Sequence, residues 1–242
     1  MTTYKEIFGK QIKFLSSDLS DASATGQIWY NSTAAKFKSI VAAEATSSAA
    51  PLNTTRAMCS GGGIQTAAFL CGGSTGAPTV GTTHTENYNG SGWATSASMS
   101  NPRAHFGATG TQTAGIAAGG GPPFAPSPGG AQSNTEEYNG SSWSEKSDMI
   151  SNTGNTKDQC FGTNSDDMMV AGGPPNLATC IGWDGTAWST RPSISTGRGG
   201  GAGAGASSTS GWIGGGQSPF KTATEEFNGE TSALNIEDFT TS

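Results

Sequence analysis

The stretch TEEYNGSSW, residues 135–143, places an Asn-Gly pair between two short runs that each carry an aromatic residue. A two-residue turn between antiparallel strands requires positive φ angles, which asparagine and glycine adopt more readily than other residues. The stretch therefore predicts a β-hairpin. In the related stretch TENYNGSGW, residues 85–93, we expect Thr85–Tyr88 to pair with Gly92–Thr95.

The hairpin motif recurs along the chain at a nearly constant spacing. Its turns begin 50, 45 and 44 residues apart, at Asn89, Asn139, Asp184 and Asn228. A pair of glycines after a short apolar run keeps the same step and begins at Gly72, Gly119, Gly172 and Gly214. Periods of 20–50 residues are typical of solenoids, propellers and arrays. The sequence therefore predicts four repeats, residues 51–98, 99–148, 149–193 and 194–242.

Each repeat has room for four short strands. The apolar run before the glycines predicts a buried strand, the hairpin adds two more, and a segment that begins at an arginine, such as Arg103–Thr109, supplies the fourth. Four-stranded sheets repeated along a chain are typical of propeller blades. We therefore expect an all-β propeller of four to five small blades. A hairpin around Trp29 and Tyr30, with a strand near Asn235–Thr240, would complete the fifth.

Two charged residues keep step with three of the four repeats. An arginine lies sixteen residues before the paired glycines, and a glutamate lies two residues before the aromatic of the hairpin. The third repeat lacks both, with Ile181 in place of the glutamate. A buried carboxylate without its guanidinium is costly, so joint presence and joint loss indicate a structural ion pair. The predicted pairs are Arg56–Glu86, Arg103–Glu136 and Arg198–Glu225.

Residues 1–50 do not share the repeat, and we expect them to form a separate attachment arm. The apolar residues Tyr4, Ile7, Phe8, Ile12 and Leu15 are spaced for a short amphipathic helix, which Gly9 interrupts. Farther along, Gln27–Asn31 and Lys36–Ile40 predict a hairpin. An Ala/Ser-rich linker, Val41–Ala50, leads to the repeats, residues 51–242.

Composition and charge exclude several classes of function. Residues 51–242 carry seven basic against fourteen acidic residues, and this acidic balance disfavours nucleic acid. No run of 18 apolar residues is present, so we expect no membrane insertion. Four cysteines without C-x-x-C spacing and two histidines do not form a metal pattern, so no metal or other cofactor is expected and the thiols are interpreted as reduced and mostly buried.

No set of residues in the sequence predicts catalysis. No serine lies in a nucleophile elbow, and neither His84 nor His105 is paired with an acid by spacing. The repeat-locked aromatic residues are interpreted as packing between blades rather than as sugar platforms. The loops that vary in length between repeats are better candidates for recognition, with Phe124, Phe220 and His84 as possible contacts.

The repeats resemble Kelch-type repeats, in which an apolar run and Gly-Gly precede a spaced tyrosine and tryptophan. Over nearly its full length the chain resembles small Kelch-like structural proteins of marine bacteriophages, including cyanophages. The opening TYKEI, residues 3–7, the segment GQIWYNST, residues 26–33, and the repeats GTQTA, residues 110–114, and TEEYNG, residues 135–140, carry this resemblance. The fourth repeat departs from it, because no tryptophan follows Asn228-Gly229.

The resemblance implies a non-enzymatic virion protein of a tail fibre, tail or capsid surface, made in the host cytoplasm. The N-terminal arm would bind other virion proteins through Tyr4, Ile7, Phe8, Ile12, Trp29 and Tyr30, and the repeats would face outward. The alternative function is a recognition module that binds a glycan on the host surface. The sequence leaves open whether copies of the chain form a homo-oligomer.

Overall fold

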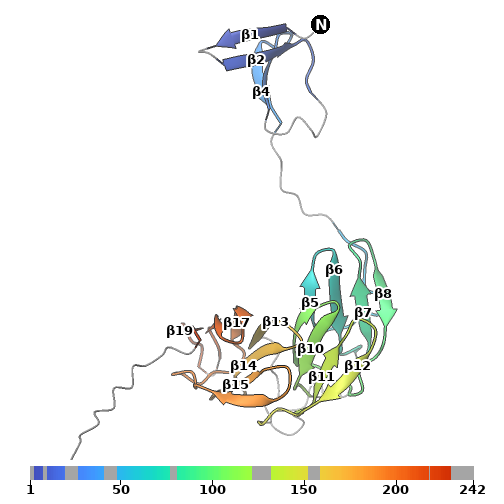
Figure 1. Ribbon diagram of the computed structural model, residues 1–242, viewed down its shortest axis with the longest axis vertical. Helices are drawn as coiled ribbons and strands as arrows, with labels where there is room; N and C mark the ends of the chain where they lie inside the picture. The colour runs from blue at the N-terminus through green and yellow to red at the C-terminus, as the bar shows by residue number, and fades with distance from the viewer. Residues whose placement is uncertain are drawn as a thin grey trace, which may run out of the picture. The chain divides into compact units, whose positions relative to one another are not determined.

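The structure is a computed structural model that describes residues 3–7, 10–19, 27–40, 48–76, 81–121, 132–151, 159–217 and 219–229. Within these ranges the chain forms strands and no helix, which confirms the all-β prediction. The chain divides into an N-terminal unit, Met1–Ser48, and a C-terminal unit, Ala49–Ser242 (Figure 1). This division lies two residues from the predicted boundary between arm and repeats.

The N-terminal unit is one four-stranded sheet. Its strands are β1 (Thr3–Ile7), β2 (Lys10–Leu15), β3 (Ile28–Asn31) and β4 (Lys36–Ser39), in the order β1-β2-β3-β4. β2 pairs antiparallel with β1 and parallel with β3, and β3 and β4 form the predicted antiparallel hairpin. This hairpin therefore pairs within the N-terminal sheet, and Asn235–Thr240, its expected partner in a fifth blade, lies outside the described residues.

The predicted N-terminal helix is wrong, because residues 3–15 form the β1–β2 hairpin. The helical spacing left out Phe14, which shares one face of β2 with Ile12 in the two-residue period of a strand. Tyr4 and Ile7 lie in β1, whereas Phe8 lies outside the described residues. The interruption at Gly9 falls between the strands, where a helix would have had to continue.

The described residues of the C-terminal unit form four antiparallel sheets in chain order. The first sheet has β5 (Ser60–Ile64), β6 (Ala67–Cys71), β7 (Thr85–Tyr88) and β8 (Trp93–Ser96). The second has β9 (Gly107–Thr111), β10 (Ala114–Ala118), β11 (Thr135–Tyr138) and β12 (Trp143–Lys146). The third has β13 (Cys160–Asn164), β14 (Asp167–Gly173), β15 (Leu177–Trp183) and β16 (Trp188–Arg191). The fourth has three described strands, β17 (Ala202–Ser207), β18 (Ser210–Gly214) and β19 (Thr224–Phe227).

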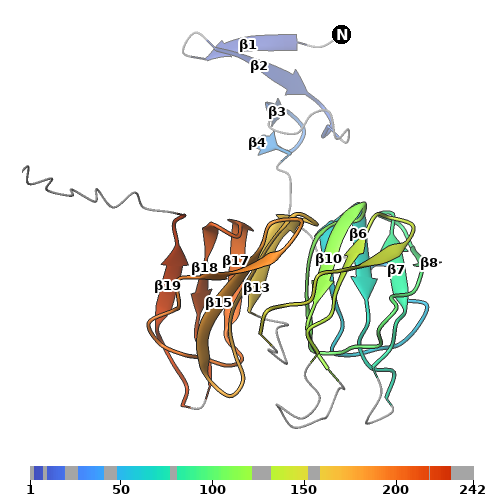
Figure 2. The ribbon, with the colours of Figure 1, turned by 60° about the horizontal axis from the view of Figure 1, so that its bottom comes forward.

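The sheets stand beside one another through their first strands. β5 lies against β9, β9 against β13, and β13 against β17, and no comparable contact among the described strands returns from β17 to β5. The first and fourth sheets therefore lie at the two ends of a row (Figure 2). The second strand of each sheet ends in or leads directly into two consecutive glycines with positive φ angles. In the fourth sheet these are Gly215 and Gly216, so the pair begins one residue later than the spacing predicts.

The core lies between consecutive sheets. Phe69 of the first sheet packs on Tyr138 and Trp143 of the second, at ring-centroid distances of 5.7 and 6.2 Å. Further apolar clusters join the second sheet to the third and the third to the fourth. The approach is close enough that an added Cβ at Gly115 would lie 2.6 Å from the Phe69 ring. Burial of these side chains is the main stabilising contribution of the repeats.

Candidate functional site

The structure brings all three predicted ion pairs together. The arginine Nη2 and glutamate Oε1 atoms lie 2.8 Å apart for Arg56–Glu86 and 2.6 Å apart for both Arg103–Glu136 and Arg198–Glu225. In each pair the glutamate belongs to the third strand of a sheet, and the arginine precedes the first strand. The guanidinium therefore ties the chain that enters each sheet to the third strand of that sheet.

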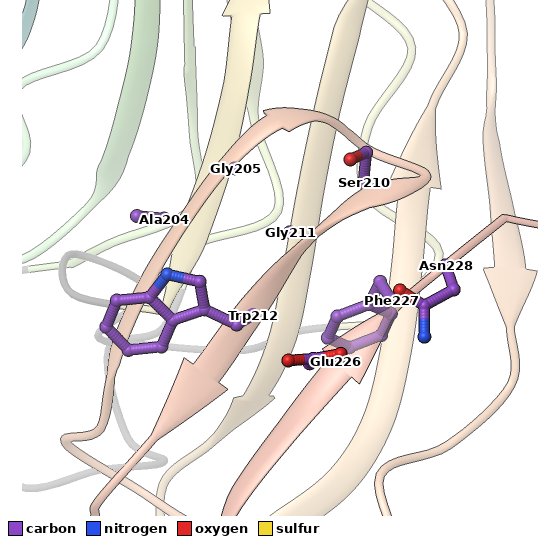
Figure 3. Close-up of a pocket in the computed structure, with 8 residues that line it drawn as sticks. All are labelled: Ala204, Gly205, Ser210, Gly211, Trp212, Glu226, Phe227 and Asn228. Atoms are coloured by element: carbon purple, nitrogen blue, oxygen red, sulfur yellow. The ribbon is translucent and has the colours of Figure 1, made fainter.

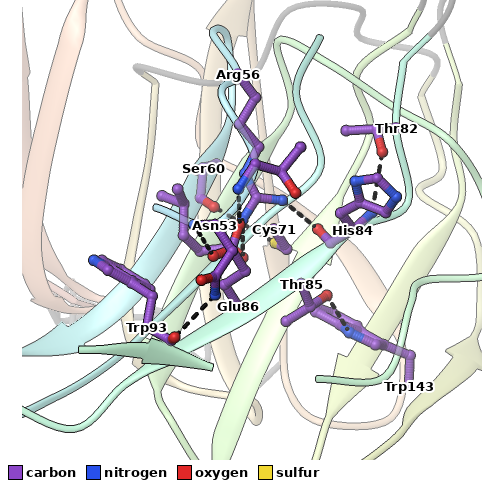
Figure 4. A network of polar contacts seen from close by, with 12 residues as sticks. Asn53, Arg56, Ser60, Cys71, Thr82, His84, Thr85, Glu86, Trp93 and Trp143 are labelled. Atoms are coloured by element: carbon purple, nitrogen blue, oxygen red, sulfur yellow. Dashed lines mark hydrogen bonds and ion pairs between the residues drawn. The ribbon is translucent and has the colours of Figure 1, made fainter. Parts of the chain in front are cut away.

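Each ion pair is part of a larger polar network, shown for the first sheet in Figure 4. The Glu86 carboxylate accepts hydrogen bonds from the amides of Asn53 and Thr54, and Arg56 donates to the carbonyl of His84 at 2.8 Å. The second and fourth sheets repeat this pattern with their own residues. Every charge is thus met by an opposite charge and by backbone groups, which is what burial of an ion pair requires.

In the third sheet, a glutamine side chain and not an ion pair forms hydrogen bonds with backbone groups of the entering segment and the sheet. The side chain of Gln159, fully buried, donates to the carbonyls of Ala171 and Arg198 and accepts from the amide of Gly200. It therefore links the third sheet to the segment that enters the fourth. Ile181 occupies the glutamate position in the core. The repeat pattern did not predict the role of Gln159, because the other repeats offer no glutamine to compare it with.

Burial and hydrogen bonds shift the pKa values of two of these charged groups. Burial lowers the pKa of Arg103, although the nearby Glu136 carboxylate opposes this effect. At Glu225, burial acts to raise the pKa, but hydrogen bonds from Ser195, Thr196 and Arg198 together leave it below its ordinary value. Both side chains therefore hold their charges in fixed hydrogen bonds. The geometry of these ion pairs supports a role in the architecture of the sheets.

A second repeated contact joins neighbouring sheets through a tryptophan. The indole nitrogen of Trp143 donates to Thr85 Oγ1 of the preceding sheet at 2.9 Å, and Trp188 donates to Thr135 Oγ1 at the same distance. The sequence analysis placed the tryptophans between blades but did not foresee the threonine. The sequence does contain a signal for this threonine, because a threonine directly precedes both Glu86 and Glu136. In the third sheet Cys180 holds that position.

The N-terminal unit presents an aromatic row across three strands. Phe14 of β2, Tyr30 of β3 and Phe37 of β4 lie opposite one another in the sheet register, with ring centroids 4.7 and 5.2 Å apart. Phe37 is 56% exposed and Ile28 is 61% exposed. Of the residues predicted for docking, Tyr30 lies in this row, Ile12 is half-buried, and Trp29 is buried.

The fourth sheet has an open hollow of about 320 Å³ beside its second and third strands. Trp212 and Glu226 face each other across β18 and β19, and Ala204 of β17 continues the same row (Figure 3). Trp212 is 44% exposed, although the register-equivalent residues of the other three sheets are buried. This is the largest aromatic surface that the C-terminal sheets leave open within a strand among the described residues.

The loops named for recognition are only partly described. Phe220 is 93% exposed between β18 and β19, and His84 is exposed, with its amide bonded to Thr82 Oγ1. Phe124 lies outside the described residues. The second strands of the sheets end on the same side of the C-terminal unit (Figure 2). Phe220 and His84, which both follow such strands, therefore belong to the same side of the C-terminal unit, although to sheets at opposite ends of the row.

The cysteines and the remaining candidates give no further chemistry. None of the four cysteines, all of which lie in the described ranges, forms a disulfide, and burial raises the pKa of Cys71 and Cys180. Across the described ranges, no three His, Cys, Asp or Glu side chains gather closely enough to hold a metal ion. No helix in the same ranges is long and apolar enough to cross a membrane. His105 lies in the segment Arg103–Thr109, which was predicted as a strand, but it takes a left-handed backbone, as does Met58 two residues after Arg56.

Sequence comparison adds no relative to this description. No protein-family model matches the chain, and no curated protein matches it.

Proposed function

We propose that this chain is a non-enzymatic structural protein of a bacteriophage virion, with the N-terminal unit as its docking element. The observation that carries the proposal is the aromatic row Phe14–Tyr30–Phe37 on a compact unit of its own. An apolar face that a small sheet leaves exposed is typical of a surface that another protein covers. Attachment through this face would leave the C-terminal unit free to point outward from the particle.

We further propose that the C-terminal sheets are blades of a Kelch-like propeller. The side-by-side first strands and the repeated glycine pairs support this arrangement. The residues that recur in the repeats form ion pairs and pack between sheets, which supports a scaffold role for this unit. A rigid array of this kind suits a component that must survive outside a cell.

The docking proposal is tested by incorporation into particles. Phe37→Asp places a charge in the exposed aromatic row, and Phe220→Asp is the matched control, because it changes an exposed phenylalanine of the other unit. We expect particles of a phage that carries this gene to lose the Phe37→Asp protein and to retain the control, as measured by mass spectrometry of purified particles. Equal incorporation of both variants would overturn the docking role, and absence of the unchanged protein from particles would overturn the virion assignment.

A second candidate function is recognition of a host-surface glycan by one end of the C-terminal unit. It is favoured by Phe220, which is almost fully exposed beside Lys221 at the side where the second strands end. An exposed aromatic ring beside a polar donor suits stacking on a sugar. Binding of purified chain to a glycan array, lost in Phe220→Ala, would support this function; an array without any binding would count against it.

A further inference from the structure

Consecutive sheets join through two faces that recur along the row. The side of a sheet that contacts the next sheet in the chain is called its forward face. In the first sheet the forward face carries Phe69 and Thr85. The rear face contacts the preceding sheet; in the second sheet it carries Gln112, Tyr138 and Trp143. One rear face on one forward face therefore makes each joint.

The rear face of the first sheet has the same residues, but no other described sheet of the C-terminal unit packs against it. Tyr88 and Trp93 pair in the register as Tyr138 and Trp143 do, and Gln65 occupies the turn position of Gln112. Gln112 donates to two carbonyls of the preceding sheet, at 2.9 and 2.8 Å. Gln65 is exposed, and within the described part of the chain neither its side chain nor the Trp93 indole nitrogen forms a hydrogen bond.

The forward face of the fourth sheet is also exposed, and its residues match those that receive a rear face elsewhere in the row. Trp212 holds the register position of Phe69, and Thr224 holds that of Thr85, the acceptor for a tryptophan. Phe69 is 1% exposed because the second sheet covers it, whereas Trp212 is 44% exposed. Thr224 is exposed, and its hydroxyl makes no hydrogen bond to another described residue.

From these two faces we infer that the forward face of the fourth sheet binds the rear face of the first sheet of a second copy of this chain. In this joint the Trp93 indole would donate to Thr224 of the other copy, and Gln65 would donate to the carbonyls of Gly211 and Phe227, which match those of Ala68 and Tyr88. Trp212 would be covered as Phe69 is. The inference is independent of any virion role.

The occupant is a second copy because the chain's own first sheet is at the other end of the row (Figure 2). Each copy offers one forward and one rear face, so the contact is head-to-tail. Such contacts either close into a ring or continue as a filament. The joint also continues the packing that already links the sheets three times within the chain.

The experiment measures the mass of the purified full chain by mass photometry and sedimentation over a range of concentrations. Trp212→Glu alters the forward face, and Gln65→Glu sets a carboxylate against two carbonyl oxygens at the rear face. Phe220→Glu is the control, because it adds the same charge to an exposed aromatic residue of the fourth sheet. We expect assemblies of the unchanged chain and the control, and about a tenfold or greater weakening in each face variant. Unchanged circular dichroism would verify that all variants fold.

Mixing the two face variants distinguishes a head-to-tail joint from any other contact. Each variant retains one intact face, so an equimolar mixture should form one-to-one dimers that do not grow. A chain that stays monomeric at all concentrations, or assemblies unaffected by both substitutions, would overturn the proposal. Assembly that appears only after residues 230–242 are removed would also overturn it, since the chain's own C-terminal segment would then be the occupant.

Discussion

Arg103 Nη2 lies 2.6 Å from Glu136 Oε1, and both side chains are fully buried. Two opposite charges inside a protein are tolerated where hydrogen bonds compensate for their lost hydration. Of the polar side-chain atoms of this pair, Arg103 Nε alone has no hydrogen-bond partner among the described residues. Here the guanidinium also donates to the carbonyls of Gly119 and Asn134, and the carboxylate also accepts from the amides of Ser100 and Asn101. The pair is thus the point at which three segments of the second repeat, residues 100–103, 119 and 134–136, are held together.

Removing one partner of this pair should be severe. Arg103→Ala leaves the Glu136 carboxylate buried without its counter-charge, and we expect the free energy of unfolding to fall by about 3–5 kcal/mol. Urea denaturation followed by circular dichroism gives this value. The double variant Arg103→Met/Glu136→Met should lose less than the two single losses added together. Strictly additive losses would show that the two charges do not stabilise each other.

The tryptophan–threonine contact predicts a smaller and position-dependent effect. Trp143→Phe keeps an aromatic ring beside Phe69 but removes the donor to Thr85, so we expect a loss of about 1 kcal/mol in unfolding free energy. Trp93→Phe, at the equivalent position of the first sheet, is the control at protein concentrations where the chain is monomeric. A loss at Trp93 equal to that at Trp143 would contradict the assigned hydrogen bond.

The close approach of the first two sheets predicts that a single methyl group is harmful. Gly115→Ala would place a Cβ 2.6 Å from the Phe69 ring, and we expect a loss of about 1–3 kcal/mol. Gly92→Ala is the control, because no atom lies within 4 Å of its added Cβ. Thermal unfolding should separate the two variants clearly. Adding Phe69→Leu to Gly115→Ala should recover part of the loss if the ring is the obstacle.

Acid should weaken the fourth sheet through Glu225. Its pKa in the folded chain lies below its ordinary value of 4.5, so its contribution to stability is complete above about pH 4.5 and is lost as the pH falls through the folded-state value. Unfolding free energies measured between pH 3 and pH 7 should decline at the acid end. Glu225→Gln should flatten part of this decline. An identical pH profile in the variant would remove Glu225 as a cause.

The repeats were predictable because their residues carry local and specific signals. Asn139-Gly140 marks a hairpin, although its loop has four residues, in which Gly140 has a positive φ and the Asn139 side chain accepts from the amides of Ser141 and Ser142. The joint occurrence of Arg103 and Glu136 marks an ion pair between residues 33 positions apart. The segment from Tyr4 to Leu15 misled because its apolar spacing fits a helix as well as a hairpin. Gln159 was missed since its two acceptors, Ala171 and Arg198, are set by tertiary structure.

The uncovered faces were also beyond sequence reasoning. Trp212 is as apolar as the residues that pack between sheets, and nothing in its neighbours along the chain indicates that it is exposed. Only the register that aligns it with Phe69 shows which covering side chains are lacking. The position of a sheet within the row, and not its local sequence, decides the exposure of an aromatic residue here.

Extensive contacts among the described sheets join only those that are consecutive in the chain. Stability is then close to a sum of terms for single sheets and for the joints between neighbours, as in a one-dimensional lattice. The outermost sheets have one joint each and should open first, so amide hydrogens of β10 and β14 should exchange more slowly than those of β6 and β18. By the same logic, gene duplication could lengthen this protein by whole repeats without redesigning any existing core.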